Sequence, residues 1–354
     1  MRKIRGRVTA VCAGILLLTC SAKFVKRTIA APQASGGSGY HLAKKIVLGG
    51  EGRWDYLLAD PATQRVFISR STHTMVVDPD GRVLGDIPNT QGVHGIALAP
   101  EFNRGFTSNG GANTVTIFDL ATLKTIGEVK VTGQNPDSIL YDAASKHVFT
   151  FNSRSGDTTA IDAKTGEVVG SMPLGGKPET AQADGTGNIY VNLEDKSQIV
   201  EFDSKALEVL NTWPIASCEE PSGLAFDVTH NRLFAGCGNN VMAVVDATNG
   251  KVVATLPIGQ GVDANGFDPE TGFAFASCGD GTLTIAHEDS PDKYTVVDTI
   301  QTQRGARTMT VDTETHTVYT VTAEFGPPPA ATADNPRPRP TLMPNSFTLL
   351  VFTR

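Results

Sequence analysis

Short runs of alternating hydrophobic and polar residues recur along the chain, and one run returns seven times in nearly the same form. The copies begin with a polar residue and end five positions later, usually at an aspartate. Alternation of this kind is typical of a β-strand with one buried face. The copies are DYLLAD (55–60), HGIALA (94–99), DSILYD (137–142), ETAQAD (179–184), SGLAFD (222–227), DANGFD (263–268) and RTMTVD (307–312). Their starts lie 39 to 44 residues apart, an interval that suits a four-stranded sheet with its turns.

Second and third strands are expected after every copy, and a fourth after all but the last. The second strand has an aromatic residue at its centre, which we expect to pack between neighbouring sheets. These aromatic residues are Phe67, Phe106, Phe149, Tyr190, Phe234, Phe275 and Tyr319. A turn of the Asp-x-x-Thr/Asn-Gly kind joins the third strand to the fourth. The order of elements predicts an all-β, seven-bladed β-propeller with four antiparallel strands per blade.

The last copy lacks a fourth strand, because the sequence stops at Arg354 just after its third strand. A surplus strand, HLAKKIVLGG, precedes the first copy. Pairing this strand with the C-terminal blade closes the ring and covers edges that would otherwise recruit other chains. We therefore expect one propeller domain over residues 41–354.

Three segments carry a family resemblance: VVDATNGKVVATLPIG (244–259), FDLATLKTIGEVKVTG (118–133) and IDAKTGEVVGSMPLGG (161–176). They resemble the repeat of the YVTN (YncE-like) β-propellers, with its aspartate, its Thr-Gly-Lys turn and its closing glycine. The resemblance covers nearly all of the chain beyond its N-terminal segment. It implies a WD40/YVTN repeat-like fold and an exported binding or surface protein. Because the repeat residues of the family are structural, the resemblance implies no particular reaction.

The N-terminal segment has the pattern of a secretory signal peptide. Four basic residues within the first seven precede an apolar run, residues 8–18, that is too short to span a bilayer. We expect a signal peptide within residues 1–30, cleaved near residue 22 or 30, and a short linker to residue 40. The protein is then periplasmic or secreted. A retained anchor, or a lipoprotein attached at Cys20, is the alternative.

The charge of the chain argues against two classes of partner. Its formal net charge is −7 at pH 7, and removal of residues 1–22 with their four positive charges leaves −11. Nucleic acid and anionic membranes attract basic surfaces. We therefore expect no nucleic acid partner and no transmembrane domain in the mature protein, which we expect to be a monomer.

The innermost strands of a propeller run in parallel around a central channel, so their first residues share one mouth. Here these positions hold four carboxylates, a histidine, a serine and an arginine. With the neighbouring tryptophan, the predicted ligand-binding set is Trp54, Asp55, His94, Asp137, Glu179, Ser222, Asp263 and Arg307. Trp54 offers either a stacking face at the mouth or packing between blades. His73, expected in the turn after the second strand of the first blade, is a further candidate for the same space.

Four of the residues at this mouth suggest a metal site. They come from consecutive blades and are Asp55, His94, Asp137 and Glu179. Carboxylate oxygens with an imidazole suit a divalent ion such as Ca²⁺, Mg²⁺, Mn²⁺ or Zn²⁺. The same cluster is also able to hold a polar ligand, or to supply an acid and a base. In the simplest alternative the carboxylates are solvated or cap loop N–H groups, and Arg307 balances its acidic neighbours.

Three cysteines follow the N-terminal segment: Cys218, Cys237 and Cys278. Exported cysteines usually pair. Cys218 precedes the fifth inner strand and Cys237 ends the next strand, so we expect a disulfide between them and a free thiol at Cys278. Pairing of Cys237 with Cys278 is the alternative. The sequence has no CxxC motif, haem-attachment or zinc-finger spacing, GxSxG elbow or phosphate-binding P-loop.

A proline-rich segment, GPPPAATADNPRPRPTLMPN (326–345), interrupts the seventh blade between its second and third strands. Its prolines oppose strand pairing and favour extended polyproline structure. We expect it over the polar face, as a lid, a docking strip for a partner or an inert loop.

These observations favour an exported propeller that binds a small-molecule ligand or an exported partner protein through its polar face. The alternative is a divalent-metal-dependent enzyme of lactonase or lyase type that uses His94 and the carboxylates at the mouth. A third hypothesis, from family analogy alone, is an accessory subunit of a periplasmic quinone or haem oxidoreductase. The sequence itself has no cofactor-attachment motif.

Overall fold

The computed structural model describes residues 37–330, 332 and 338–354. The predicted signal peptide, its cleavage sites and Cys20 lie outside these residues. Short strands and turns make up nearly all of the described chain, which confirms the all-β class; its helices are the 3-10 turns η1 (Pro100–Phe102) and η2 (Glu194–Lys196). No helix within the described ranges is long and apolar enough to cross a membrane.

Antiparallel pairing groups the described strands into six sheets, of which five have four strands each. The first sheet contains β9 (Pro136–Asp142), β10 (His147–Asn152), β11 (Asp157–Asp162) and β12 (Val168–Pro173). The second sheet contains β13 (Pro178–Ala183), β14 (Asn188–Leu193), β15 (Gln198–Asp203) and β16 (Glu208–Pro214). The third sheet contains β17 (Pro221–Asp227), β18 (Arg232–Cys237), β19 (Val241–Asp246) and β20 (Lys251–Pro257). The fourth sheet contains β21 (Val262–Asp268), β22 (Phe273–Cys278), β23 (Thr282–Ser290) and β24 (Lys293–Gln301). In each of them the strands are neighbours in chain order, because tight turns connect them.

The fifth four-stranded sheet joins the two ends of the described chain. It contains β25 (Met309–Asp312), β26 (Thr317–Thr322), β27 (Thr348–Thr353) and β1 (His41–Val47). Strand β1 pairs antiparallel with β27, from His41 opposite Thr353 to Val47 opposite Thr348. The pairing of the surplus N-terminal strand with the C-terminal strands is therefore as the sequence predicts.

The sixth sheet has seven strands, because one long strand belongs to two ladders. Its members are β2 (Leu57–Asp60), β3 (Arg65–Ser69), β4 (Ser71–Val77), β5 (Val83–Ala99), β6 (Arg104–Asn109), β7 (Thr114–Asp119) and β8 (Thr125–Lys130). The first part of β5 pairs with β4, and the part from Val93 onward pairs with β6. Asn89 and Gly92, between these parts, have φ angles of 63° and 66°, so the backbone turns there without ending the strand.

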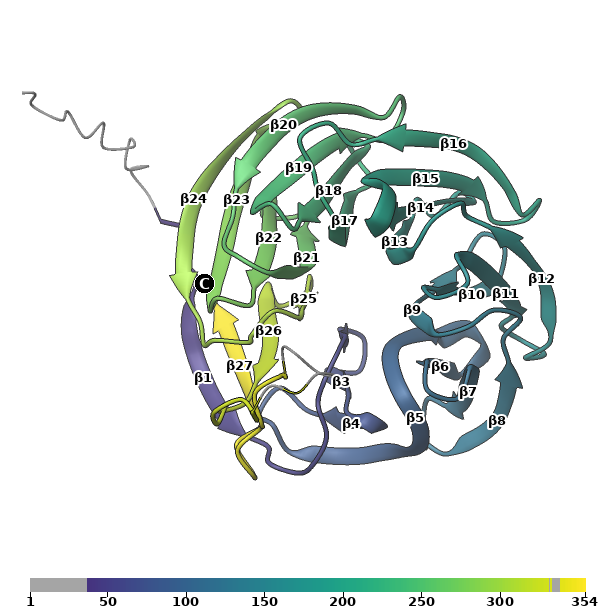
Figure 1. Ribbon diagram of the computed structural model, residues 1–354, viewed down its shortest axis with the longest axis horizontal. Helices are drawn as coiled ribbons and strands as arrows, with labels where there is room; N and C mark the ends of the chain where they lie inside the picture. Colours follow the sequence, from purple (N-terminus) through teal and green to yellow (C-terminus); the bar gives the residue numbers. More distant parts are fainter. Residues whose placement is uncertain (1–36, 331, 333–337) are drawn as a thin grey trace, which may run out of the picture. The chain divides into compact units, whose positions relative to one another are not determined.

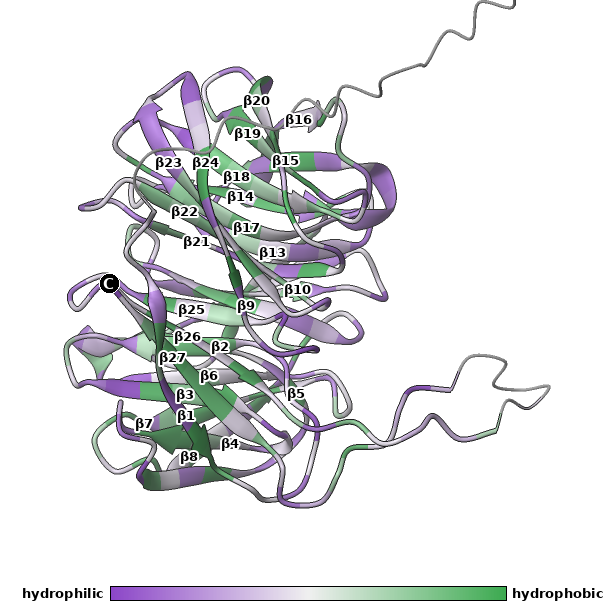
Figure 2. Ribbon diagram, turned by 90° about the vertical axis from the view of Figure 1, so that its left-hand side faces the viewer, coloured by the Kyte–Doolittle hydropathy of each residue, from purple (hydrophilic) through white to green (hydrophobic). Residues whose placement is uncertain are grey.

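Within residues 37–354 the sheets follow one another around a central axis (Figure 1). The first strand of each repeat is the innermost, and each of these strands contacts the next; β25 in turn contacts β2. The residues that open the innermost strands therefore share one face of this unit, and those that close them share the opposite face. Figure 2 shows hydrophobic residues concentrated along the strands and hydrophilic residues in many of the connecting loops.

The aromatic residues of the second strands form the core, as predicted. All seven are buried, with at most 4% of their surface accessible. Several contact a ring from the adjacent part of the structure: Phe149 meets Phe202 at 5.5 Å between ring centroids, and Phe234 meets Phe267 at 5.1 Å. Burial of each such ring contributes about 1.5–3 kcal/mol, so this layer is what holds neighbouring sheets together.

A disulfide joins Cys218, in the loop before β17, to Cys237 at the end of β18, with 5.4 Å between their Cα atoms. This is the predicted pair. Cys278 is a free, buried thiol, also as predicted. Burial and, to a lesser extent, the charge of Asp280 raise its pKa to about 12, so it stays a thiol at neutral pH.

Candidate functional site

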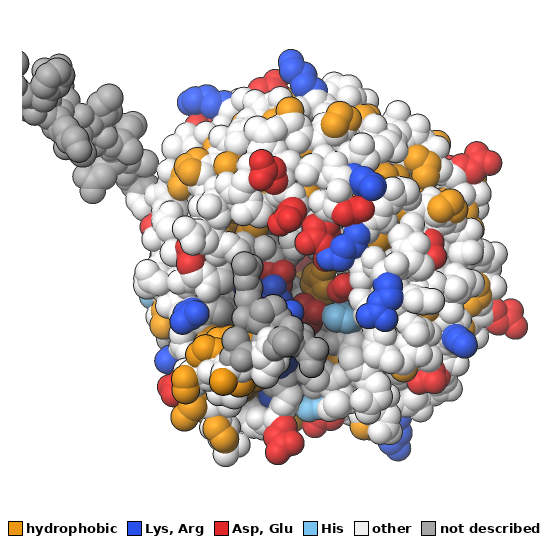
Figure 3. Space-filling model, viewed as in Figure 1, with side chains coloured by type: hydrophobic (Ala, Val, Ile, Leu, Met, Phe, Trp, Pro, Cys, Tyr) orange, Lys and Arg blue, Asp and Glu red, His pale blue; other side chains and the backbone are white. Residues whose placement is uncertain are grey.

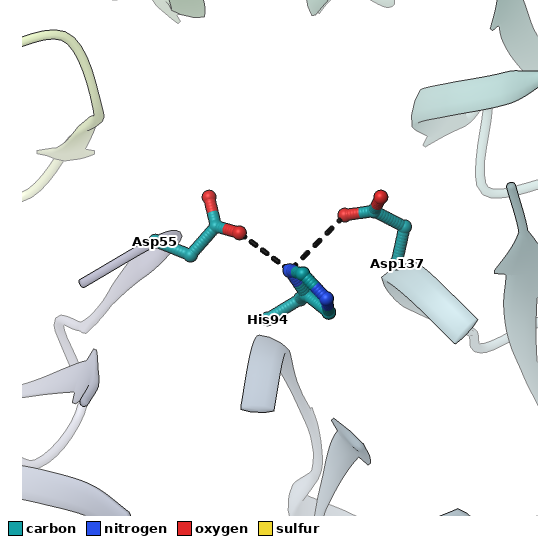
Figure 4. Close-up of side chains that lie close together, drawn as sticks. All are labelled: Asp55, His94 and Asp137. Atoms are coloured by element: carbon teal, nitrogen blue, oxygen red, sulfur yellow. Dashed lines mark hydrogen bonds and ion pairs between the residues drawn. The ribbon is translucent and has the colours of Figure 1, made fainter. Parts of the chain in front are cut away.

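Three residues from the predicted ring converge at the mouth of the central channel: Asp55, His94 and Asp137 (Figure 4). Asp55 lies just before β2, His94 lies in the second part of β5 and Asp137 lies in β9. The Nδ1 atom of His94 is 2.6 Å from Oδ2 of Asp55 and 3.5 Å from Oδ1 of Asp137. We call these residues the mouth triad. Figure 3 shows acidic, basic and histidine side chains gathered around the central hollow of this face.

Serine hydroxyls hold the backbone behind the mouth residues. Ser69 donates a hydrogen bond to the carbonyl oxygen of His94, and Ser108 donates to that of Asp137, both at 2.5 Å. Ser277 does the same for Arg307. These serines occupy one repeat position, in RVFIS, RGFTS and FAFAS, so their recurrence is visible in the sequence although their bonding partners are not.

A buried arginine positions the loop that leads to Trp54 and Asp55. Arg70 donates hydrogen bonds to the carbonyl oxygens of residues 49, 51 and 52 at 2.7–3.2 Å, and its guanidinium lies 3.6 Å from the ring centroid of Phe347. Burial lowers its pKa to about 10, so it remains charged at neutral pH. Arg70 was not among the predicted site residues, because the equivalent position in the other copies holds asparagine, leucine, cysteine or threonine and no other copy has a charge there.

His73 does not take part in the mouth. We expected it in the turn after the second strand, but β4 begins at Ser71 and places His73 within this third strand. Its Nε2 atom is 3.7 Å from Oδ1 of Asp86 on the adjacent β5. The turn is shorter than expected because Ser71 adopts a positive φ of 60°, which reverses the chain within a single residue.

The mouth triad carries a proton at neutral pH. Burial lowers the pKa of His94, but the hydrogen bond with Asp55 and the charges of Asp137, Asp55 and Glu179 outweigh it and raise the pKa to about 9. Burial also raises the pKa of Asp137, against the lowering effect of His94. At neutral pH the imidazole is therefore a cation that bridges two carboxylates.

Glu179 lies beside the mouth triad rather than in it. We expected it as a fourth metal ligand, but its Oε1 is 2.8 Å from Nζ of Lys177, which also contacts Glu194. Burial, followed by the charge of Asp137, raises the pKa of Glu179 to about 8 despite this lysine. Lys177 was not among the predicted site residues, although it lies two residues before Glu179, a spacing that places both on one face of an extended chain.

The other side of the mouth is formed by Ser222, Asp263 and Arg307. Nη1 of Arg307 is 3.1 Å from Oδ1 of Asp263, and Oγ of Ser222 lies 3.5 Å from the same oxygen. Burial raises the pKa of Asp263 to about 6; Arg307 opposes this, whereas Asp55 and Asp137 add to it. The expected balance of Arg307 against acidic neighbours is therefore present, with Asp263 as its direct partner.

A cavity of about 350 Å³ adjoins the mouth on the side of Arg307. We call it the arginine cavity. Its lining residues are Arg53, Trp54, Gly279, Arg304, Gly305, Arg307, Phe325, Arg339 and Pro340. Among the described residues, no carboxylate pairs with Arg304 or Arg339. Trp54 lies at one wall and packs against Phe325 and Phe347, so it both lines the cavity and contributes to packing.

The proline-rich segment forms part of this cavity. Phe325, just before the segment, pairs with Leu342 within it, and Arg53 donates a hydrogen bond to the carbonyl oxygen of Pro340 at 3.0 Å. The described arms extend away from the sheets (Figure 2). The sequence places this segment on the polar face, but it does not show that Arg339 and Pro340 line a cavity together with Arg304.

Tyr56 lies beneath the mouth. Its hydroxyl is 3.4 Å from that of Thr180, which belongs to β13, three inner strands further around the axis. Burial first, then Glu179 and the other carboxylates, raise its pKa well above the ordinary value, so the phenol stays neutral. Below it, a channel of about 520 Å³ is lined by all seven inner strands. Tyr56 therefore narrows the path between the mouth and the channel.

The donor atoms of the mouth triad fit a divalent ion. One atom each from Asp55, His94 and Asp137 lies within 4.8 Å of the others. Two oxygens and an imidazole nitrogen suit Zn²⁺ or Mn²⁺, with room for further ligands. An ion would have to replace the proton on Nδ1 of His94, so its affinity would fall as the pH is lowered.

Comparisons with known proteins support the fold alone. No family model matches the chain, and no curated protein matches it. Among solved structures, the chain is similar to the WD40 β-propeller domain of Doa1, with a TM-score of 0.68, over 90% of this chain and 98% of that domain. The two sequences are 13% identical. The protein is therefore a β-propeller, a fold that serves many unrelated functions.

Proposed function

We propose that this protein is an exported β-propeller that binds a small anionic ligand in the arginine cavity at the mouth of its channel. The observation that carries the proposal is that Arg304 and Arg339 both line this cavity and that neither has an acidic partner among the described residues. Guanidinium groups form paired hydrogen bonds with carboxylate and phosphate groups. A volume of about 350 Å³ is within the range of small-molecule sites.

Two features narrow the chemistry of the ligand. Trp54 and Phe325 supply flat, apolar walls, which favour a ligand with a planar part. On the other side of Arg307 the carboxylates of Asp263 and the mouth triad accept hydrogen bonds. A planar acid that also carries hydroxyl or amino groups would therefore use the whole mouth.

Binding of an aromatic carboxylate tests this proposal. We expect isothermal titration to show saturable binding of benzoate, and Arg304→Gln and Arg339→Gln each to weaken it at least about tenfold, since each removes a charged hydrogen bond. Arg82→Gln is the matched control, because Arg82 is exposed and pairs with Asp78 at the periphery. Absence of saturable binding, or equal effects of all three variants, would refute the proposal.

Seven blades and a closed ring are part of the proposal. Strand β5 pairs with β4 and then with β6, so the seven-stranded sheet divides into two four-stranded blades that share β5. Pairing of β1 with β27 and contact of β25 with β2 support closure. An experimental structure with another number of repeats around the channel would contradict this count.

Export, membership of the YVTN (YncE-like) family and a monomeric state are also proposed. The basic and apolar N-terminal pattern and the disulfide support export, and the three repeat segments support the family. Mass spectrometry of the protein from cell fractions should find a chain that begins after residue 22 or 30 outside the cytoplasm. A full-length cytoplasmic chain would contradict export. Native mass and pull-down measurements test for the monomer and for an exported partner, including an oxidoreductase.

A metal-dependent lactonase or lyase is the second candidate function. It is favoured by the mouth triad, whose donor atoms converge on one point. A bound divalent ion would polarise a carbonyl there, while Glu179, with a pKa of about 8, would hold or release a proton near neutral pH. If purified protein retains no ion, or if His94→Ala leaves its metal content unchanged, this candidate is excluded.

A further inference from the structure

A second cluster of metal-binding side chains lies on the face opposite the mouth. Asp227 closes β17, whose other end carries Ser222 at the mouth. Asp227 is five positions after Ser222, which is about 17 Å of extended chain. His230 lies in the turn that follows β17, and Glu288 lies in β23 of the neighbouring sheet. We call these three residues the far-face triad.

The geometry of the far-face triad is compact. Nδ1 of His230 is 2.7 Å from Oδ2 of Asp227 and 3.1 Å from Oε1 of Glu288. Ligands of a tetrahedral Zn²⁺ are about 3.4 Å apart, as follows from bonds of about 2.1 Å. The donor atoms therefore lie slightly closer than such an ion requires, and an ion that replaces the proton on Nδ1 of His230 would move them apart by about 0.3–0.7 Å.

Glu288 has no hydrogen-bond partner for the oxygen that faces this cluster. Its side chain is 5% exposed, and its buried Oε1 accepts no hydrogen bond. Nδ1 of His230 has at most one hydrogen to donate, and Asp227 is the closer acceptor. A buried, unpartnered carboxylate oxygen is costly.

We propose that the far-face triad binds a divalent transition-metal ion, with Zn²⁺ as the best fit. One imidazole nitrogen and two carboxylate oxygens are ligands that Zn²⁺ commonly takes, and an ion would give Glu288 the partner it lacks. A cavity of about 400 Å³ reaches these residues, and the imidazole is 46% exposed, so water has access to complete the coordination. The ion links the sheet of β17 to that of β23 and stabilises their contact.

The nearest cation does not occupy the site. Arg232 lies beside the far-face triad, but its guanidinium is bonded to Asp292 at 2.8 Å and lies 3.4 Å from Asp246. It also donates to the carbonyl oxygens of His230 and Pro291. Its ion pairs are therefore with carboxylates outside the triad.

A similar group in the next sheet provides a matched control. His316 contacts Asp268 through Nδ1 at 2.8 Å, but it contacts Glu270 through Nε2 at 3.6 Å. Its two carboxylates therefore lie on different sides of the ring, and Glu270 is 78% exposed. This arrangement has the same residue types without convergence on one point.

Equilibrium dialysis of the full chain against Zn²⁺, followed by metal analysis, tests the inference. We expect Glu288→Gln and His230→Asn each to lose one equivalent of zinc relative to the wild type, and Glu270→Gln to lose none. Added Zn²⁺ should raise the melting temperature of the wild type by about 5 °C at a hundredfold excess over Kd, and that of Glu288→Gln by less. Circular dichroism without metal checks that each variant is folded.

A second variant separates this site from the mouth. Asp137→Asn changes the mouth triad only, so it should keep the equivalent that Glu288→Gln loses. The inference is overturned if the wild type binds no zinc, if Asp137→Asn alone abolishes binding, or if Glu270→Gln has the same effect as Glu288→Gln. Bound Co²⁺, which gives visible absorption bands, should report loss of a nitrogen ligand in His230→Asn even where zinc content falls only in part.

Discussion

The mouth carries fewer negative charges at neutral pH than its four carboxylates suggest. His94 has a pKa of about 9 and is protonated, and Glu179, with a pKa of about 8, is largely protonated as well. The neighbouring carboxylates raise the pKa of His94 against the effect of its burial, whereas burial and then Asp137 raise the pKa of Glu179. A mouth of this kind tolerates an anionic ligand beside it, since the imidazolium and Arg307 offset the remaining carboxylates.

His94 should make the protein less stable as the pH rises from 6.5 to 9. Its pKa in the folded protein is about 9 and its ordinary value is 6.5, so the folded state binds the additional proton. This stabilisation is fully present below pH 6.5, is lost as the pH rises through 9, and amounts to about 3 kcal/mol. We expect the free energy of unfolding in urea to depend less on pH in His94→Gln than in the wild type.

Glu179 gives a change of the same sign between pH 4.5 and 8, because its pKa is also raised. Because Glu179 and His94 interact, the difference between the two proteins reports the loss of His94 together with its effect on Glu179. Identical pH profiles for the wild type and His94→Gln would contradict a protonated imidazole at this position.

The sequence predicts which side chains come together where those residues occupy a repeat position. Asp55, His94 and Asp137 occupy one repeat position, so their convergence follows from the register of the inner strands. Cys218 and Cys237 were predictable for the same reason. Lys177, Arg304 and the buried Arg70 were not, because they lie in loops whose side-chain directions the repeat does not determine.

At the scale of elements, β1 and β5 carry the architecture. Strand β5 serves two ladders, and β1 covers the outer edge of β27. The sequence showed the surplus N-terminal strand, because it lies outside the repeat. It did not show the continuous β5, because the hairpin pattern predicts two separate strands with a loop between them.

Removal of β1 should destabilise the protein and expose a strand edge. We expect a chain that begins at residue 48 to melt several degrees below one that begins at residue 37, since β27 loses its partner. The truncated chain should also self-associate in size-exclusion chromatography. The chain from residue 37, which keeps β1, is the control. Equal melting temperatures and elution volumes would show that β1 contributes little to closure.

At the scale of the molecule, two candidate sites lie at opposite ends of the central axis. The arginine cavity and the mouth triad lie at the start of the inner strands, and the far-face triad lies at their end. The sequence predicted a polar face and its carboxylates. It did not predict the arginine cavity, because the position of residues 339 and 340 depends on the path of a proline-rich segment that no repeat governs.

The most direct test of the central claim is a crystal structure of the protein soaked with benzoate. We predict density for one molecule in the arginine cavity, with its carboxylate between Arg304 and Arg339 and its ring against Trp54. An empty cavity at saturating benzoate, or density only at some other place on the protein, would contradict the claim.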